Sequence, residues 1–202
     1  MNRRELLRSV LVAAAGAVIT PRAVAGDDIV LRFQQRYHGL TSVRCSFAGS
    51  PGPRGTLVAV RGGKFRLETS DRIIVSDGKA VYNATPSSKT VIINRFNPKA
   101  TDVSIERMFF DILSVYRATA SQGAGNSHTL RLLPPSPTAI VSGVRELTAT
   151  IDASSMNISR LVATTDSGQY TFTISNLKVN RSVPSSAFTY APPSGWEVID
   201  LR

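Results

Sequence analysis

The chain has 202 residues and a formal net charge of +10 at pH 7, and 42% of its residues are hydrophobic. This length suits one domain with one core, and the single cysteine excludes an internal disulfide. The Lys and Arg residues are scattered along the sequence rather than clustered, which argues against a protein that follows a nucleic-acid backbone.

Residues 1–25 have the layout of a secretory signal peptide: three arginines, a short apolar run at 10–19 and a final Ala-Val-Ala cleavage site. The apolar run is too short to span a bilayer. We expect cleavage after residue 25, which leaves 26–202 as a single domain exported to the periplasm. The Arg3-Arg4 pair also fits a loose twin-arginine pattern, so the export route stays open between the Sec and twin-arginine systems.

An amphipathic helix is predicted from Asp27 to about Gly39, because two carboxylates suit its N-terminus and apolar residues follow at three- and four-residue spacing. The apolar stripe consists of Ile29, Phe33, Tyr37 and Leu40. A strand follows at 43–47, where Cys45 alternates with polar neighbours. We interpret Cys45 as a small buried hydrophobic residue.

Residues 55–96 read as a meander of short antiparallel strands. Gly62-Gly63 and Asp77-Gly78 stand where two-residue hairpin turns require positive φ angles. The period of two then places one set of apolar side chains on one face: Leu57, Ala59, Phe65 and Leu67. We expect Ile73, Val75 and Val81 to extend this face.

A second helix is predicted to begin near Thr101-Asp102, with a wide apolar face. That face carries Ile105, Met108, Phe109, Ile112, Leu113 and Tyr116. From the pattern alone, an ordinary core helix is the simpler interpretation. The strands then resume from 129 to 175, and their alternation predicts inward-facing Leu147, Ala149, Ile151, Tyr170, Phe172 and Ile174. Regularly spaced strands of this kind indicate one curled sheet, a sandwich or a barrel.

Catalytic motifs are absent from the sequence. The two histidines are far apart, the chain has no His-Glu-x-x-His or paired-cysteine motif, and no Gly-x-Ser-x-Gly elbow occurs. We therefore predict that the protein is not an enzyme and has no catalytic residue, no metal site and no cofactor. A binding protein remains the favoured class.

Several segments together resemble the periplasmic outer-membrane lipoprotein carrier family, the LolA-like proteins. These are Gly55-x-Leu57 leading to Arg61, the runs 64–67 and 74–79, and a closing segment at 188–200 with an aromatic strand followed by Pro-Pro-x-Gly. The resemblance implies a mainly β fold: an incomplete, half-open antiparallel barrel with an α-helical lid that encloses a hydrophobic cavity. In that reading the second helix belongs to the lid.

The resemblance also implies a function. The protein would bind the acyl chains of lipoproteins, take them from an inner-membrane lipoprotein-releasing transporter and pass them to an outer-membrane acceptor, as a chaperone-like monomer. The expected cavity residues are Phe33, Tyr37, Phe47, Leu57, Ala59, Phe65, Leu67, Ile73, Val75, Val81, Phe109, Ile112, Leu147, Ala149, Ile151, Tyr170, Phe172 and Ile174. Plain core packing would use the same residue types.

Arg61 stands where the family has an arginine that reaches the backbone of the lid and holds it shut. Here Gly62-Gly63 follows, where family members often have proline. Without the family, Arg61 is a solvent-facing turn residue. Three alternatives to the carrier function remain: transport of another lipid, sensing of mislocalised lipoproteins, and an enzyme that acts on lipids.

Overall fold

The computed structural model describes residues 25–50, 52–98, 105–121, 123 and 126–202. The predicted signal peptide, apart from Ala25, lies outside these residues, as does the predicted start of the second helix. Within the described ranges, none of the helices is long and apolar enough to cross a membrane.

The described strands form one sheet. Along the chain they are β1 (Ser42–Ser50), β2 (Arg54–Val60), β3 (Lys64–Thr69), β4 (Ile73–Asp77), β5 (Ala80–Thr85), β6 (Thr90–Arg95), β7 (Arg117–Ser121), β8 (Ser127–Leu133), β9 (Val144–Asp152), β10 (Ile158–Thr165), β11 (Gly168–Val179) and β12 (Glu197–Asp200). Their order across the sheet is β12-β6-β5-β4-β3-β2-β1-β11-β10-β9-β8-β7. The predicted meander and its hairpins are therefore confirmed, but the turns differ from the predicted ones: residues 61–63 join β2 to β3, and Gly78-Lys79 joins β4 to β5 with a positive φ at Gly78 alone.

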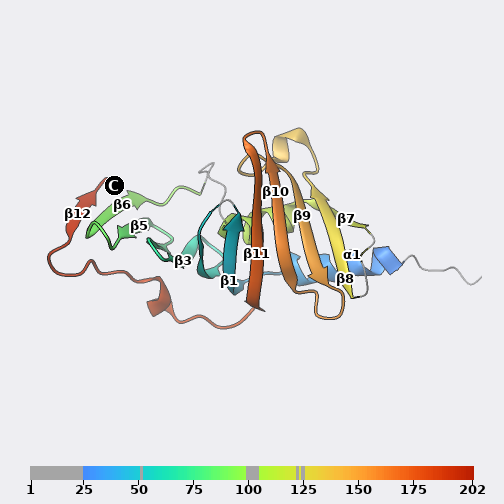
Figure 1. Ribbon diagram of the computed structural model, residues 1–202, viewed down its shortest axis with the longest axis horizontal. Coiled ribbons are helices and arrows are strands. Elements are labelled where there is room, and N and C mark those ends of the chain that lie inside the picture. The colour runs from blue at the N-terminus through green and yellow to red at the C-terminus, as the bar shows by residue number, and fades with distance from the viewer. Residues whose placement is uncertain (1–24, 51, 99–104, 122, 124–125) are drawn as a thin grey trace, which may run out of the picture.

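Strand β1 lies near the middle of this order and joins two parts of the sheet: it pairs with β2 on one side and with β11 on the other. All neighbours are antiparallel except β12, which lies parallel to β6 at one edge. The opposite edge is β7, so the sheet stays open (Figure 1). The predicted fold class, a mainly β protein whose barrel does not close, is confirmed.

Two helical segments cover one side of the sheet, behind β1 and β7–β11 in the view of Figure 1. The first is α1 (Ala25–His38), which packs against β7 and α3. The second, which we call the lid, consists of α2 (Ile105–Arg107), the π-helical segment η1 (Met108–Ile112) and α3 (Leu113–Val115). Two short 3₁₀ segments complete the fold, η2 (Pro137–Ala139) and η3 (Ser185–Phe188).

The larger hydrophobic cluster lies between these helices and the sheet face that carries Leu57 and Ala59, which we call the inner face. In antiparallel strands, directly paired residues lie on the same face, so the register Leu161↔Ala149 and Ala163↔Leu147 continues this face across β9 and β10. The alternation predicted for β9 and β11 is correct. Ile174 is buried, while Tyr170 and Phe172 are half-buried.

A second hydrophobic cluster lies on the opposite, outer face of β4–β6. Its buried residues are Ala80, Ala84, Val91 and Ile93, with Ile73, Tyr82, Tyr190 and Trp196 packed around them. The chain after β11 supplies the last two residues, and the rings of Tyr82 and Tyr190 lie 6.0 Å apart. Figure 1 shows this returning segment running along the lower edge of the sheet to β12.

The register corrects two predicted cavity residues, Ile73 and Val75. Leu67 pairs with Ile74, which places Ile74 on the inner face and its neighbours Ile73 and Val75 on the outer face. Val81 pairs with Ser76 and does lie on the inner face, as predicted. The error arose because β4 begins with three consecutive apolar residues, so alternation alone could not assign their faces.

Candidate functional site

The inner face between helices and sheet is the place where the predicted cavity residues meet. Eleven of them are buried members of one cluster: Phe33, Tyr37, Phe47, Leu57, Ala59, Phe109, Ile112, Leu147, Ala149, Ile151 and Ile174. Phe65, Leu67, Tyr170 and Phe172 pack against it while half-buried. Phe109 and Ile112 of the lid are 0% and 1% exposed. The lid therefore fills the space under β7–β11 with its own side chains.

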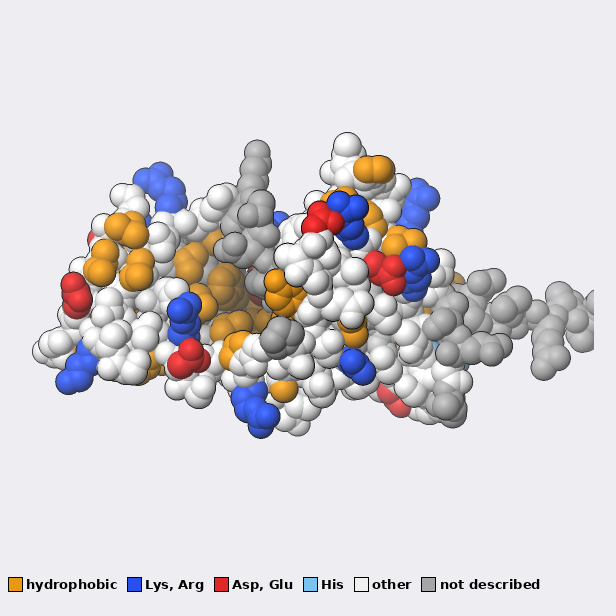
Figure 2. Space-filling view, turned by 45° about the horizontal axis from the view of Figure 1, so that its top comes forward, with side chains coloured by type: hydrophobic (Ala, Val, Ile, Leu, Met, Phe, Trp, Pro, Cys, Tyr) orange, Lys and Arg blue, Asp and Glu red, His pale blue; other side chains and the backbone are white. Residues whose placement is uncertain are grey.

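Beyond the lid, the inner face continues along β3–β6 with side chains that are only half-buried. Leu67, Ile74 and Ile92 lie on successive strands of this part, and the paired position on β5 is Asn83. The Oδ1 atom of Asn83 is buried without a hydrogen-bond partner. Figure 2 shows hydrophobic side chains gathered in a hollow near the middle of the molecule. The inner face thus has one part packed by the lid and one part left half-covered.

Two buried tyrosines fix the helices to the strands. The Tyr37 hydroxyl donates to the Met156 carbonyl at 3.0 Å, and burial raises the pKa of Tyr37 to about 12. At the end of the lid, the Tyr116 hydroxyl donates to the carbonyl of Val144 and accepts from the Val141 amide at 3.0 Å. The sequence predicted Tyr37 as a stripe and cavity residue and Tyr116 as a stripe residue, but not these hydrogen bonds, because a partner far along the chain leaves no local sequence signal.

Arg61 lies between the end of α1 and the lid. Its Nε atom donates to the Leu40 carbonyl at 3.0 Å, and its guanidinium carbon lies 5.8 Å from the centre of the Phe110 ring. Among the described residues, the predicted hydrogen bonds to lid carbonyls do not form, and Arg61 instead bonds to the residues after α1 and makes a cation–π contact with the lid. Gly62 and Gly63 both have positive φ, and a Cβ on Gly63 would clash with the ring of Phe96.

A carboxyl that the sequence did not single out lies beside this contact. Burial, and then the negative charge of Asp111, raises the pKa of Glu106 to about 7, while the Arg107 charge lowers it. The Arg107 charge acts on both Glu106 and Asp111, because its Nε atom forms an ion pair with Asp111 at 3.0 Å. Glu106, Arg61 and Phe110 line a cavity of about 310 Å³ at this edge of the lid.

Cys45 is buried on the inner face, as predicted. Burial raises the pKa of its thiol to about 12, so the thiolate that would react is strongly disfavoured. In the described part of the chain, no three His, Cys, Asp or Glu side chains are placed to hold a metal ion together.

A crystal structure of an uncharacterized conserved protein from Thermus thermophilus is similar to this fold. The TM-score is 0.51 at 13% sequence identity, with 86% of this chain and 98% of the other covered. A LolA superfamily protein from Nitrosomonas europaea gives a TM-score of 0.40 at 12% identity, covering 83% and 99% of the two chains. A putative outer membrane lipoprotein-sorting protein domain from Vibrio parahaemolyticus gives 0.43 at 10%, covering 81% and 95%.

No curated protein matches the sequence. The family model of the outer membrane lipoprotein carrier protein LolA, however, matches residues 48–191, well over half of the 202 residues. The matched range runs from the end of β1 into the segment after β11, so it includes β2–β11 and the whole lid but not α1 or most of β1. The chain belongs to the LolA family of outer membrane lipoprotein carrier proteins.

Proposed function

We propose that this protein carries the acyl chains of lipoproteins on its inner face, where they replace the side chains of the lid. The observation that supports this most directly is the divided inner face. One part is packed by the lid, and the adjoining part on β3–β6 presents the half-buried side chains of Leu67, Ile74 and Ile92 beside Asn83. An acyl chain could enter at the half-buried part and extend under the lid as the lid moves away.

The energetics suit reversible loading. Each methylene buried from water is worth about 0.8 kcal/mol, so an acyl chain gains by binding, but it must displace lid side chains that already fill the site. The net free energy of binding is the difference between the apolar contacts that the acyl chain makes and those that the displaced lid side chains made. This difference keeps the affinity low enough for release. The middle of the lid, Met108–Ile112, is π-helical, a rare conformation that occurs frequently at functional sites.

The proposal includes a route. Residues 1–25 act as a cleaved signal peptide, and residues 26–202 work in the periplasm as a monomeric chaperone for lipoproteins. Cargo comes from an inner-membrane lipoprotein-releasing transporter and goes to an outer-membrane acceptor. The family is one of carriers, which supports a binding role rather than catalysis.

Mass spectrometry of what co-purifies with the protein from the periplasm tests this proposal. Acylated peptides are the expected result. Free lipid alone would indicate that the cargo is another lipid and not a lipoprotein. Binding to mislocalised lipoproteins without transfer would indicate a sensor, and turnover of added lipid would indicate an enzyme.

A pair of variants on β11 tests the inner face itself. Phe172→Glu places a carboxylate beside Phe47, whose ring lies 6.4 Å away, and burying that charge costs several kcal/mol. Thr173→Glu adds the same charge at the next, exposed position and serves as the control. We expect only Phe172→Glu to lose acyl cargo, with folding measured separately by circular dichroism. Equal cargo in both folded variants would contradict the inner-face site.

A further inference from the structure

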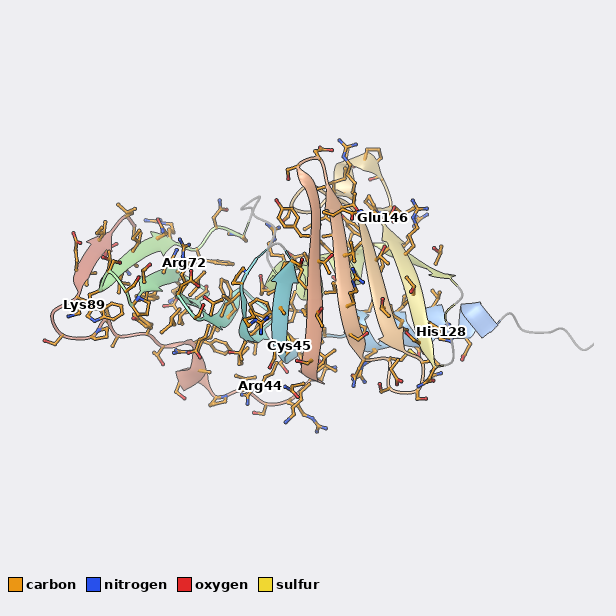
Figure 3. The ribbon with its side chains drawn as sticks, in the orientation of Figure 1. Arg44, Cys45, Arg72, Lys89, His128 and Glu146 are labelled. Carbon is orange, nitrogen blue, oxygen red and sulfur yellow. The ribbon has the colours of Figure 1, made fainter. Side chains whose placement is uncertain are left out.

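A basic pocket lies at one end of the central strands, away from the lid. It has a volume of about 570 Å³ and is formed where α1 ends, β1 begins and β11 passes into the following segment. Four cations line it: Arg36, Arg44, Lys178 and Arg181. Figure 3 shows Arg44 at this end, below β1 and β11 in that view.

These cations lack acidic partners. No Asp or Glu lines the pocket, and no carboxylate of the described residues lies within 4.0 Å of any of the four. Arg44 and Lys178 are also directly opposite each other on β1 and β11. Like charges at directly paired strand positions repel, so this arrangement lowers stability unless an anion lies between them.

Arg36 adds a directed donor. A terminal nitrogen of its guanidinium donates to the Asn157 Oδ1 atom at 2.7 Å, which fixes the group without neutralising it. Its Nε atom is buried and has no hydrogen-bond partner among the described residues. A buried donor without a partner is costly, so Arg36 brings to the pocket wall a guanidinium group that Asn157 orients and that has one unsatisfied donor, Nε.

Hydrogen bonds between the start of β1 and the segment after β11 hold the rest of the pocket wall in place. The Arg181 amide donates to the Ser42 Oγ atom at 2.8 Å, and that hydroxyl donates to the Arg181 carbonyl at 2.6 Å. The Asn180 Oδ1 atom in turn accepts from the Thr41 amide at 2.8 Å. The chain that carries Arg181 is therefore fastened to the start of β1, which fixes the backbone from which the exposed Arg44 and Arg181 side chains extend.

We propose that this pocket binds a phosphate group, as a monoester or diester. Three guanidinium groups and one ammonium group can surround several oxygens of one phosphate, and the planar fork of arginine matches phosphate geometry. Val43, Leu177 and Val179 give the pocket an apolar side that an organic substituent can contact. The phosphate belongs either to a phospholipid head group or to a soluble compound. This inference does not depend on the proposed carrier function.

Titration of the full mature protein with inorganic phosphate tests the site. We expect the Arg36 Nε–H resonance to shift in a ¹H–¹⁵N spectrum, and calorimetry to give saturable binding. The double variant Arg44→Gln/Lys178→Gln should weaken binding by at least about tenfold, because each lost charge-assisted bond is worth more than the 1.4 kcal/mol that equals a factor of ten. Lys178→Gln alone is the fallback if the double variant does not fold.

The matched control is Arg160→Gln, which removes an exposed arginine of β10 from the same sheet surface. It should bind phosphate like the unmodified protein. Sodium chloride at equal ionic strength corrects for screening. The proposal is overturned if phosphate produces no shift and no heat up to tens of millimolar, or if the double variant and the control bind equally well.

Vesicles distinguish the two sources of the phosphate. If the source is a head group, the protein should sediment with phosphatidylglycerol vesicles, inorganic phosphate should release it, and the double variant should remain in the supernatant. If inorganic phosphate binds but the vesicles recruit the double variant equally, the site takes a soluble phosphate compound. Vesicle binding that phosphate does not compete for, without any inorganic phosphate binding, would contradict the site.

Discussion

The two parts of this sheet bury opposite faces. Strands β7–β11 keep their inner face against α1 and the lid, and their outer face carries polar and charged residues such as Arg131 and Glu146 (Figure 3). Strands β4–β6 bury their outer face under the returning C-terminal segment and leave their inner face half-covered. The proposed binding surface therefore begins on the half-covered strands and continues along the same face into the core under the lid.

One sheet can thus be packed on both of its parts and still leave a surface half-covered. The β4–β6 part has its own hydrophobic cluster on the outer face, so its fold does not depend on covering the inner face. The β7–β11 part has no such second cluster among the described residues, and its stability depends on the helices.

Leu147→Ala should cause the largest loss. Leu147 is fully buried in the inner cluster, and buried Leu→Ala changes cost about 2–5 kcal/mol. Urea unfolding followed by circular dichroism measures the change. Leu31→Ala, at a position 54% exposed on α1, is the matched control and should change stability by about 0.5 kcal/mol or less. Equal effects would mean that the inner cluster does not dominate stability.

Glu106→Gln should stabilise the lid in a pH-dependent way. The folded pKa of about 7 lies above the ordinary value of 4.5, so between these values the folded protein holds a proton that the unfolded chain releases. Stability from this group is thus present below about pH 4.5 and is lost as the pH rises through 7. At pH 8 the variant should be more stable by up to about 3 kcal/mol, and at pH 4 the two proteins should match.

Thermal and urea unfolding at both pH values provide the measurement. Asp111→Asn tests the cause, since Asp111 is the second contributor to the raised pKa after burial. It should reduce the pH dependence only in part. A Glu106→Gln variant with the unmodified pH profile would show that Glu106 ionises normally in the folded protein.

Trp196→Ala should loosen the outer cluster without releasing the lid. Trp196 packs against this cluster while half-buried, so we expect a loss of about 1–3 kcal/mol, below that of a fully buried aromatic residue. Hydrogen exchange should rise in β4–β6 and β12 and stay unchanged in β9 and β10. Faster exchange throughout the sheet would mean that the two parts are one cooperative unit.

Arg61→Leu removes the hydrogen bond to Leu40 and the contact with Phe110, and should cost about 1 kcal/mol. The lid should open more readily, while the added apolar side chain retains acyl chains near it. We expect a folded protein that loads lipoprotein but transfers it poorly. Loading and transfer assays decide the matter: unchanged transfer would make Arg61 a plain turn residue, and lost loading would make it a cargo contact.

Photo-crosslinking should change stability least. It tests most directly which face of the sheet contacts acyl cargo. A crosslinking amino acid at Phe65 on the inner face should capture acyl cargo, whereas the same group at Ile73 on the outer face should not. Capture at both positions would contradict the division between the two faces.

Sequence patterns alone determined most of the secondary structure. Alternation fixed the inner faces of β2, β9 and β11, and the glycine turns fixed the hairpins around Gly63 and Gly78, since these signals depend on neighbouring residues. Cys45 and the α1 stripe were correctly predicted as buried for the same reason.

The face that β4 buries could not be predicted from the sequence, because its consecutive apolar residues satisfy either assignment. The register with Leu67 and the packing of the returning C-terminal segment select one of them. The tertiary structure also decided the partners of Arg61, the raised pKa of Glu106 and the meeting of Arg36 with Lys178. Hydrogen bonds, burial and charge between residues far apart in the chain depend on distances in space, and no local pattern in the sequence encodes them.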